Sequence, residues 1–346
     1  MYFFINTLVG GKNKEILPEN VNDMRLANDF SAFFENKIND ICANIDNNVS
    51  EIRYLPDIPY CKLDKFKEVT FTDMKDIISI TKKTHCERDP FPIRDVKEQR
   101  NLDKLTVVLH RITNLSLENG IFPKTEKEAS VRPTLKSGKD QQNIESYRPI
   151  SNLSFLGKVI ETVAKKQLTA HMEKLNVLPE DQSAYREFHS TETALCGIVS
   201  DLLEYMDEGK CAILILLDLS AAFDTVDHEL LIDDLMYIGV EGVALEWFKS
   251  YLENRSYHVI INGTKSEKRT LHRGVPQGSV LGPVLFSIYT IELAWILNHH
   301  RVQFKMFADD TQLYFVINNV EDTITTLNDL VCDIKQWMAK KKLKIE

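Results

Sequence analysis

Three acidic residues follow two apolar stretches that have the character of strands. Asp218 ends the run Ile-Leu-Ile-Leu-Leu at 213–217, and Asp309 and Asp310 follow a stretch in which apolar residues alternate from residue 302. A buried apolar strand has no reason to end in carboxylates unless a positive group lies there. Carboxylates brought together repel one another, and divalent metal ions relieve that repulsion. Two such ions can drive transfer of a nucleotidyl group, so we predict that these residues are catalytic metal ligands.

Each acidic residue also has a plainer explanation. Asp218 could cap a helix, and two adjacent aspartates suit a tight turn. Asp224 and Asp227 are better explained by capping and surface roles. Phe223, five residues after Asp218, is either a core aromatic residue or a bulky ring that lines the incoming sugar and excludes a 2′-hydroxyl.

A glycine-rich segment at 274–283 reads Gly-Val-Pro-Gln-Gly-Ser-Val-Leu-Gly-Pro. Glycines let the backbone approach a ligand closely, and Gln277 can hydrogen-bond a nucleotide or a template sugar. The alternative is an ordinary turn before a helix. The order of residues in this segment favours the functional interpretation.

Two cations and one polar segment complete the candidate site. Lys136 follows a predicted strand, and Arg148 lies in Tyr-Arg-Pro-Ile-Ser at 147–151, after a loop; both could hold a triphosphate. The polar and aromatic segment 182–191 suits contact with a template. None of these segments is specific by itself.

Hydrophobic periodicity predicts the elements that position these residues. The first 120 residues form a helical N-terminal and linker region, with helices at 26–38, 72–81 and 102–118 and a polar linker at 46–64. From residue 121 the pattern becomes mixed. We expect strands at 129–135 and directly before Asp218, and hairpins at 257–271 and 302–316. We expect helices at 155–178, 191–206, 227–238 and 320–338, and one more that begins at about residue 283. Asp224 is expected to cap the helix at 227–238. The Asp309–Asp310 pair is placed at the tip of the second hairpin.

Composition excludes several classes of protein. The 346 residues contain six scattered cysteines without a Cys-x-x-Cys pair, which is typical of reduced thiols in an intracellular protein. No apolar run approaches the ~20 residues of a membrane span, so no membrane contact is expected. The net charge of −9 is uneven. The acidic segment 218–246 has no lysine or arginine, whereas the lysine-rich segment 335–344 would either contact phosphate or form a solvated helix face.

Taken together and in this order, the motifs resemble the reverse transcriptase of non-LTR (LINE-type) retrotransposons, most like the jockey group. The resemblance covers roughly residues 121–346, through Tyr-Arg-Pro-Ile-Ser, Arg-x-x-His-Ser-Thr, Leu-Asp-Leu-Ser-x-Ala-Phe-Asp, Gly-Val-Pro-Gln-Gly-Ser-x-Leu-Gly-Pro and Phe-Ala-Asp-Asp. It implies an α+β right-hand polymerase fold with fingers and palm in 121–346.

The resemblance also implies an activity and a set of roles. The activity is RNA-directed DNA polymerisation from deoxynucleoside triphosphates, an RNA template and a DNA primer, in the nucleus. Two Mg²⁺ ions, or Mn²⁺ in their place, would be held by Asp218, Asp309 and Asp310. Substrate would be bound by Phe223, Gln277, Lys136 and Arg148.

The chain departs from the family pattern in ways that keep rival interpretations open. No endonuclease domain is visible upstream, and the sequence ends just past the palm, so we expect a fragment of a larger protein with the thumb largely missing. One rival is a catalytically inactive remnant or RNA-binding scaffold. Another is a DNA-templated two-metal polymerase, which Tyr-Arg-Pro-Ile-Ser and Val-Pro-Gln-Gly disfavour.

Overall fold

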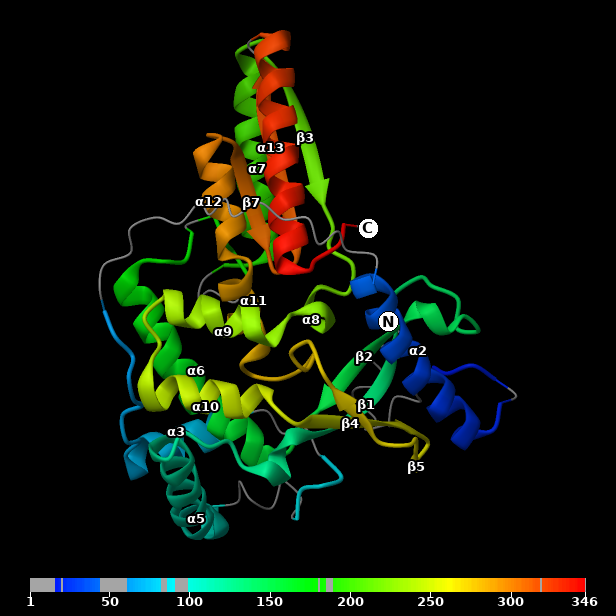
Figure 1. Cartoon of the computed structure of the whole chain (residues 1–346), viewed down its shortest axis with the longest axis vertical. Coiled ribbons are helices and arrows are strands. Elements are labelled where there is room, and N and C mark those ends of the chain that lie inside the picture. The colour runs from blue at the N-terminus through cyan, green and yellow to red at the C-terminus, as the bar shows by residue number, and fades with distance from the viewer. Residues whose placement is uncertain are drawn as a thin grey trace.

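The computed structural model describes residues 16–19, 21–43, 61–81, 86–90, 99–179, 181–184, 189–317 and 319–345. Most of the predicted linker at 46–64 and part of the polar segment 182–191 lie outside these residues. The secondary structure is mixed, with two separate β-sheets and helices packed around them (Figure 1).

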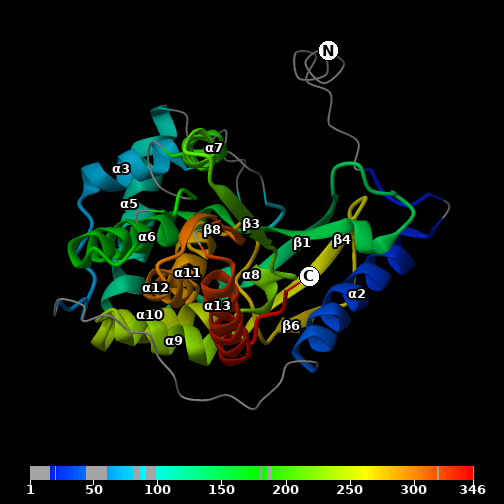
Figure 2. The same ribbon diagram turned by 90° about the horizontal axis from the view of Figure 1, so that it is seen from above.

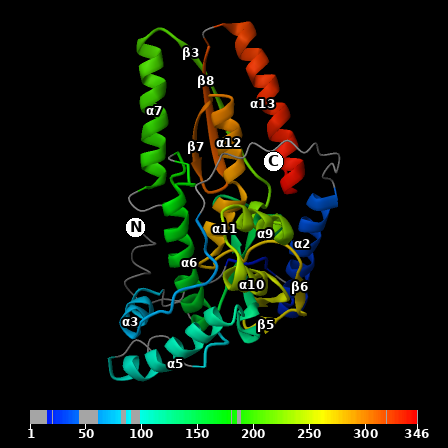
Figure 3. The same cartoon turned by 60° about the vertical axis from the view of Figure 1, so that its left-hand side comes forward.

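The smaller sheet has three antiparallel strands in the order β3-β8-β7. These are β3 (Cys211–Leu217), β7 (Gln303–Phe307) and β8 (Asp310–Ile317). Figure 3 shows α7 (Thr191–Asp207) and α13 (Val320–Lys341) on opposite sides of this sheet. Helix α12 (Ile291–His299) packs beside β7. The second predicted hairpin is therefore confirmed, as β7 and β8.

The larger sheet has the order β2-β1-β4-β5, and β6 also pairs with β4. Its strands are β1 (Glu128–Leu135), β2 (Tyr147–Asn152), β4 (Arg255–Ile261), β5 (Thr264–Lys265) and β6 (Arg269–Leu271). Strand β1 is antiparallel to β2 and parallel to β4. Asn262 and Gly263 turn the chain from β4 into β5 with positive φ angles of 49° and 85°. An Asn-Gly pair is suited to that left-handed turn, and the predicted hairpin is confirmed.

Helix α2 (Asp23–Ala43) lies along the larger sheet (Figure 2). Phe30 and Phe34 are buried there, and the Phe30 ring meets the ring of Tyr147 on β2 edge to face at 4.9 Å. Arg269 on β6 donates to the Ser31 hydroxyl and pairs with Glu35. A helix from the N-terminal region is thus packed against strands that follow it by more than 100 residues.

The largest apolar core lies among the helices. Around α6 (Phe155–Leu175) pack α3 (Phe71–Ile80), α5 (Gln99–Glu118), α9 (His228–Tyr237), α10 (Gly242–Leu252) and α11 (Gly282–Tyr289). The indole Nε1 of Trp247 on α10, fully buried, donates to the Ser116 hydroxyl at 3.0 Å. Short helical turns at Lys124–Lys127, Ile144–Ser146 and α8 (Ala222–Thr225) connect these elements.

Several sequence predictions were wrong in detail. Strand β2 at residues 147–152 and helix α10 were not predicted. Strand β3 is not buried: it lies at an edge of its sheet, and Leu214 and Leu216 are 46% and 68% exposed. The cap of α9 is Asp227, which accepts hydrogen bonds from the backbone of Glu229 and Leu230, and not Asp224.

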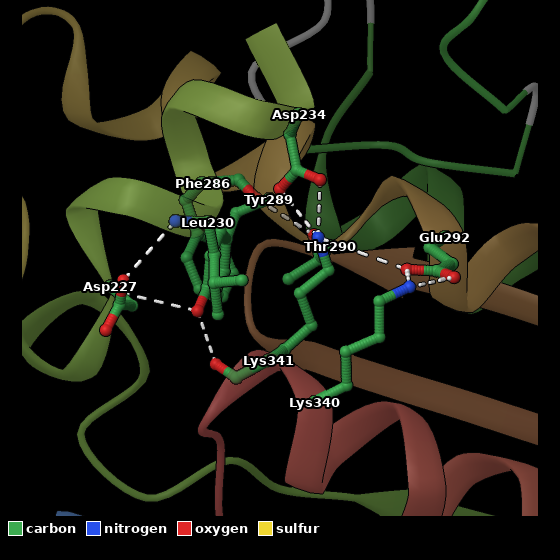
Figure 4. A network of polar contacts seen from close by, with 9 residues as sticks. All are labelled: Asp227, Leu230, Asp234, Phe286, Tyr289, Thr290, Glu292, Lys340 and Lys341. Carbon is green, nitrogen blue, oxygen red and sulfur yellow. Dashed lines mark hydrogen bonds and ion pairs between the residues drawn. The ribbon is translucent and has the colours of Figure 1, made fainter. Parts of the chain in front are cut away.

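The lysine-rich segment is neither a phosphate site nor a solvated face for most of its length. Lys341 is buried and its Nζ lies 2.5 Å from Asp234, while Lys340 pairs with Glu292 at 2.7 Å (Figure 4). Lys342 pairs with Asp227 at 2.6 Å. The Tyr289 hydroxyl, also drawn in Figure 4, donates to the Lys341 carbonyl. Asp227 and Asp234 belong to the acidic segment, so two ion pairs join the two charged segments and hold the end of α13.

All six cysteines are free thiols. Among the described helices, none combines the length and apolar character that crossing a membrane requires.

Candidate active site

The pairing of β3 with β8 brings the three predicted metal ligands to one end of the smaller sheet. The last pair of the ladder is Leu217 with Thr311, so continuing the register by one position sets Asp218 opposite Asp310. Facing positions in an antiparallel pair lie about 5 Å apart at Cα. Asp309 belongs to the two-residue turn between β7 and β8, in which Ala308 has a φ of 59°. The turn is therefore Ala308-Asp309, and Asp310 begins β8.

The three carboxylates affect one another electrostatically. Burial is the first cause that raises the pKa of Asp309, and the negative charge of Asp218 raises it further. Burial also raises the pKa of Asp310, with added repulsion from Asp309 and Asp218. Arg148 acts against both shifts. Close, mutually repelling carboxylates are the arrangement that a bound cation stabilises.

One cavity of about 420 Å³ opens beside these residues. Six of the seven predicted site residues line it: Lys136, Arg148, Asp218, Phe223, Gln277 and Asp309. Asp310 is exposed next to it and does not contribute to its lining. The sequence thus selected residues that four distant segments bring to one place.

The two cations come from the hairpin of β1 and β2. Arg148 pairs with Thr134 in the register, and Lys136 directly follows β1, where its backbone N–H donates to the Ser146 carbonyl at 2.8 Å. Both side chains reach the cavity that contains Asp218 and Asp309. The cavity therefore has carboxylates along one part of its wall and cations along another, a distribution that suits a metal-bound polyphosphate.

The glycine-rich segment is held between α8 and β2. Val275 donates its N–H to the Phe223 carbonyl at 2.9 Å, and the Gln277 carbonyl accepts from Ser151 on β2 at 2.8 Å. Gly278 has a φ of 102°, and a Cβ there would stand 2.7 Å from the Ser151 carbonyl oxygen. A glycine is required at this position, and it allows the loop to carry Gln277 to the cavity.

The sequence profile of the reverse transcriptase (RNA-dependent DNA polymerase) family matches residues 135–346 of this chain. The chain belongs to the reverse transcriptase family. The mixed α/β architecture around Asp218 and Asp309 is consistent with a palm-like polymerase fold, and members of the reverse transcriptase family generally use divalent metal ions.

Several proteins of mobile elements are similar to this member of the reverse transcriptase family. The probable RNA-directed DNA polymerase from transposon BS of Drosophila melanogaster is 32% identical over 68% of this chain and 26% of its own length. The RNA-directed DNA polymerase from mobile element jockey of the same organism is 28% identical over 87% of this chain and 34% of its own length. The probable RNA-directed DNA polymerase from transposon X-element of Drosophila melanogaster is 28% identical over 70% of this chain and 26% of its own length. The chain thus spans about a third or less of the length of these relatives.

The donor set of this reverse transcriptase site fits a hard divalent cation. Carboxylate oxygens are the ligands that Mg²⁺ prefers, and all three candidate residues supply them. In the described part of the chain, no three Asp, Glu, His or Cys side chains already converge on one point. By the strand register, Asp218 and Asp310 occupy facing backbone positions, and Asp309 directly precedes Asp310.

Two residues of the cavity were missed as site residues by the sequence analysis. Lys37 on α2 and Asp224 both line it. Burial raises the pKa of Asp224, and the charge of Lys37 opposes that shift. Lys37 lies outside the motifs, and its helix showed only an apolar stripe. Asp224 was interpreted as a helix cap. Its spacing from Asp218 was the one signal for a role in the site. The residue that it contacts there, Gln277, lies 53 residues away in the sequence.

Proposed function

We propose that this chain is the polymerase part of a non-LTR mobile-element protein, an RNA-directed DNA polymerase that transfers a nucleotidyl group from a deoxynucleoside triphosphate to a primer 3′-hydroxyl. The observation that carries the proposal is the cavity in which Asp218 and Asp309 lie with Lys136 and Arg148. The names of the similar proteins agree with this activity.

The carboxylates of Asp218, Asp309 and Asp310 would hold two Mg²⁺ ions, or Mn²⁺ in their place. Such ions, when bound, lower the pKa of the attacking hydroxyl and neutralise charge on the triphosphate and the leaving pyrophosphate. The raised pKa values of Asp309 and Asp310 favour this role, because the ligand-free carboxylates repel one another.

The protein's own side chains orient the nucleotide. Lys136 and Arg148 bind and position the phosphates, Arg148 through its planar guanidinium. Phe223 stacks on Phe286, with ring centroids 4.5 Å apart, so the Phe223 ring is fixed where it lines the cavity and excludes a 2′-hydroxyl. Gln277 hydrogen-bonds the nucleotide or the template beside it.

The rest of the architecture is assigned on the same basis. The larger sheet, with its β1–β2 hairpin, would be the fingers, and the smaller sheet with its helices the palm, both within residues 121–346 after a helical region 1–120. The template is RNA and the primer DNA, bound through backbone and 2′-hydroxyl contacts. The proposed place of action is the nucleus.

Primer extension on an RNA template with a DNA primer and Mg²⁺ tests this function. The wild-type chain should extend the primer, and the Asp309→Ala/Asp310→Ala variant should not. Asp207→Asn, an exposed change on α7, is the matched control and should extend normally. A folded wild-type chain that gives no extension would contradict the proposal, and preference for a DNA template would favour a DNA-templated polymerase.

A further inference from the structure

Asp224 and Gln277 form a side-chain pair inside the cavity. The amide Nε2 of Gln277 donates to Oδ2 of Asp224 at 2.6 Å. Both residues line the cavity together with Asp218 and Asp309. The loop that carries Gln277 packs closely on α8, because a Cβ at Gly274 would lie 2.6 Å from the Asp224 carbonyl oxygen.

The chemistry of this pair fixes the orientation of the glutamine amide. An ionised carboxylate has no proton, so only the NH₂ end of Gln277 can face it. The amide oxygen of Gln277 is then directed away from Asp224. A protonated Asp224 has a strong O–H donor that pairs with the amide oxygen, so the opposite orientation of Gln277 becomes the favoured one.

The charges around Asp224 come from several elements. Burial raises the pKa of Asp224, and both the charge of Lys37 on α2 and the hydrogen bond from Gln277 act against that shift. Tyr257 on β4 lines a neighbouring cavity together with Asp224. Burial raises the pKa of Tyr257, and the charge of Asp224 adds to that shift. Arg255 on β4 lines the neighbouring cavity to which Asp224 also contributes. Lys136 and Arg148 share the main cavity with the carboxylates of Asp218 and Asp309.

We propose that Asp224 is a positioning residue whose protonation state sets which end of the Gln277 amide is presented to the bound nucleotide. The ionised form presents the amide oxygen, a hydrogen-bond acceptor, and this is the productive state. The proposal rests on the proposed function, since it assigns the nucleotide to this cavity. It adds a switch that the metal ligands do not provide.

Asp224 titrates in the range in which such a switch acts. Burial outweighs the contributions of Lys37 and Gln277 and raises the pKa of Asp224 to about 7. Asp224 is therefore mostly ionised at pH 8 and mostly protonated at pH 6. If only the ionised form presents the acceptor, the apparent nucleotide affinity falls about tenfold from pH 8 to pH 6, in proportion to the population of the competent state.

The amide orientation is tested directly by NMR, without any need for activity. The side-chain amide signals of Gln277, labelled with ¹⁵N and assigned by their loss in Gln277→Leu, should shift with a midpoint near pH 7. They should stay constant from pH 6 to 8 in Asp224→Asn, whose amide cannot titrate. Absence of a titration in the wild-type chain, or the same titration in Asp224→Asn, would overturn the proposal.

Steady-state extension kinetics test the consequence for the substrate. The KM for the deoxynucleoside triphosphate should rise about tenfold from pH 8 to pH 6 in the wild-type chain and in the Asp207→Asn control. In Asp224→Asn the KM should be independent of pH. A wild-type KM that does not change with pH would overturn the proposal. If the wild-type chain extends no primer at all, the proposed function fails, and the NMR titration still decides whether Asp224 orients Gln277.

Discussion

At the scale of single residues, Phe223 is the side chain whose size matters most. Its ring lines the cavity and is held by stacking on Phe286. We expect Phe223→Val to admit ribonucleotides, because the space for a 2′-hydroxyl opens beside the sugar. Discrimination between deoxy- and ribonucleotides should fall about 10- to 100-fold, the range that steric contacts of one group supply.

Competitive extension with mixed deoxy- and ribonucleoside triphosphates measures this ratio. Phe223→Tyr keeps the ring in place and serves as the matched variant, with discrimination close to the wild type. Unchanged discrimination in Phe223→Val would mean that the ring belongs to the core and does not contact the sugar.

The repulsion among the carboxylates has a measurable effect on stability. Because the pKa values of Asp309 and Asp310 are raised, the folded chain binds their protons more tightly than the unfolded chain, and their ionisation destabilises the fold as the pH rises. We expect Asp309→Asn to raise the Tm at pH 7.5 in the presence of a chelator. Mg²⁺ should raise the Tm of the wild type and leave that of the variant nearly unchanged. A variant that melts lower in chelator would contradict this explanation.

The sequence predicted some site residues better than others for a physical reason. Asp218, Asp309 and Asp310 stand out because charge at the end of an apolar strand is locally anomalous. Lys37 and Asp224 look ordinary locally, and only the packing of α2 and of the 274–278 loop brings them to the cavity. Residues whose roles depend on distant partners carry no signal in their own neighbourhood.

At the scale of elements, the 274–278 loop is the part most sensitive to small changes. Gly278→Ala combines a φ of 102° with a Cβ 2.7 Å from the Ser151 carbonyl oxygen. We expect a loss of about 2 kcal/mol or more in the free energy of unfolding and a displaced Gln277. At Gly209 the φ is also positive, at 69°, but an added Cβ would have nothing within 4 Å. Gly209→Ala therefore measures backbone strain alone and should lower the free energy of unfolding by about 1 kcal/mol.

Denaturant unfolding of the two variants gives the comparison. If Gly278→Ala is no less stable than Gly209→Ala, the close approach of the loop to β2 is not required for folding.

The elements were predictable where local chemistry decides them. The turn at Asn262-Gly263 follows from its two residues, and α6 follows from its apolar stripe. Strand β2 was missed because Pro149 argues against a strand, and in the sheet it faces another proline, Pro133. The missed helix α10 buries Trp247, Phe248 and Tyr251, while Glu246 and Lys249 pair on its exposed side, so its amphipathic period was present in the sequence and was overlooked.

At the scale of the whole molecule, α13 is anchored by buried charge. Lys341 is 3% exposed at its side chain and pairs with Asp234, whose pKa burial raises to about 6. Lys341→Ala leaves that carboxylate without its closest cation, and we expect a loss of about 3–5 kcal/mol in the free energy of unfolding at pH 7.5. The loss should be smaller at pH 5, where Asp234 is protonated in the wild type too.

Urea unfolding at the two pH values measures these losses. Lys335→Ala, an exposed lysine on the same helix, should change stability by less than about 0.5 kcal/mol. Equal effects of the two substitutions would show that the buried pair does not fix α13.

Helix α2, from the N-terminal region, packs against the larger sheet and also lines the cavity, which the sequence did not reveal. The family profile begins at residue 135, and the predicted boundary lies at 120, yet α2 covers the larger sheet and contributes Lys37 to the cavity. The family motifs therefore locate the catalytic residues, whereas tertiary packing determines which other segments contribute to the cavity.

The exposed strand β3 has a consequence for handling the protein. Its free side offers backbone N–H and C=O groups in a row, flanked by Leu214 and Leu216, and such an edge is a template to which another extended chain can add. Two copies that meet there would lengthen the smaller sheet across the molecular boundary. The same strand that carries Asp218 to the site is therefore also an open edge, at which we expect self-association to rise with protein concentration.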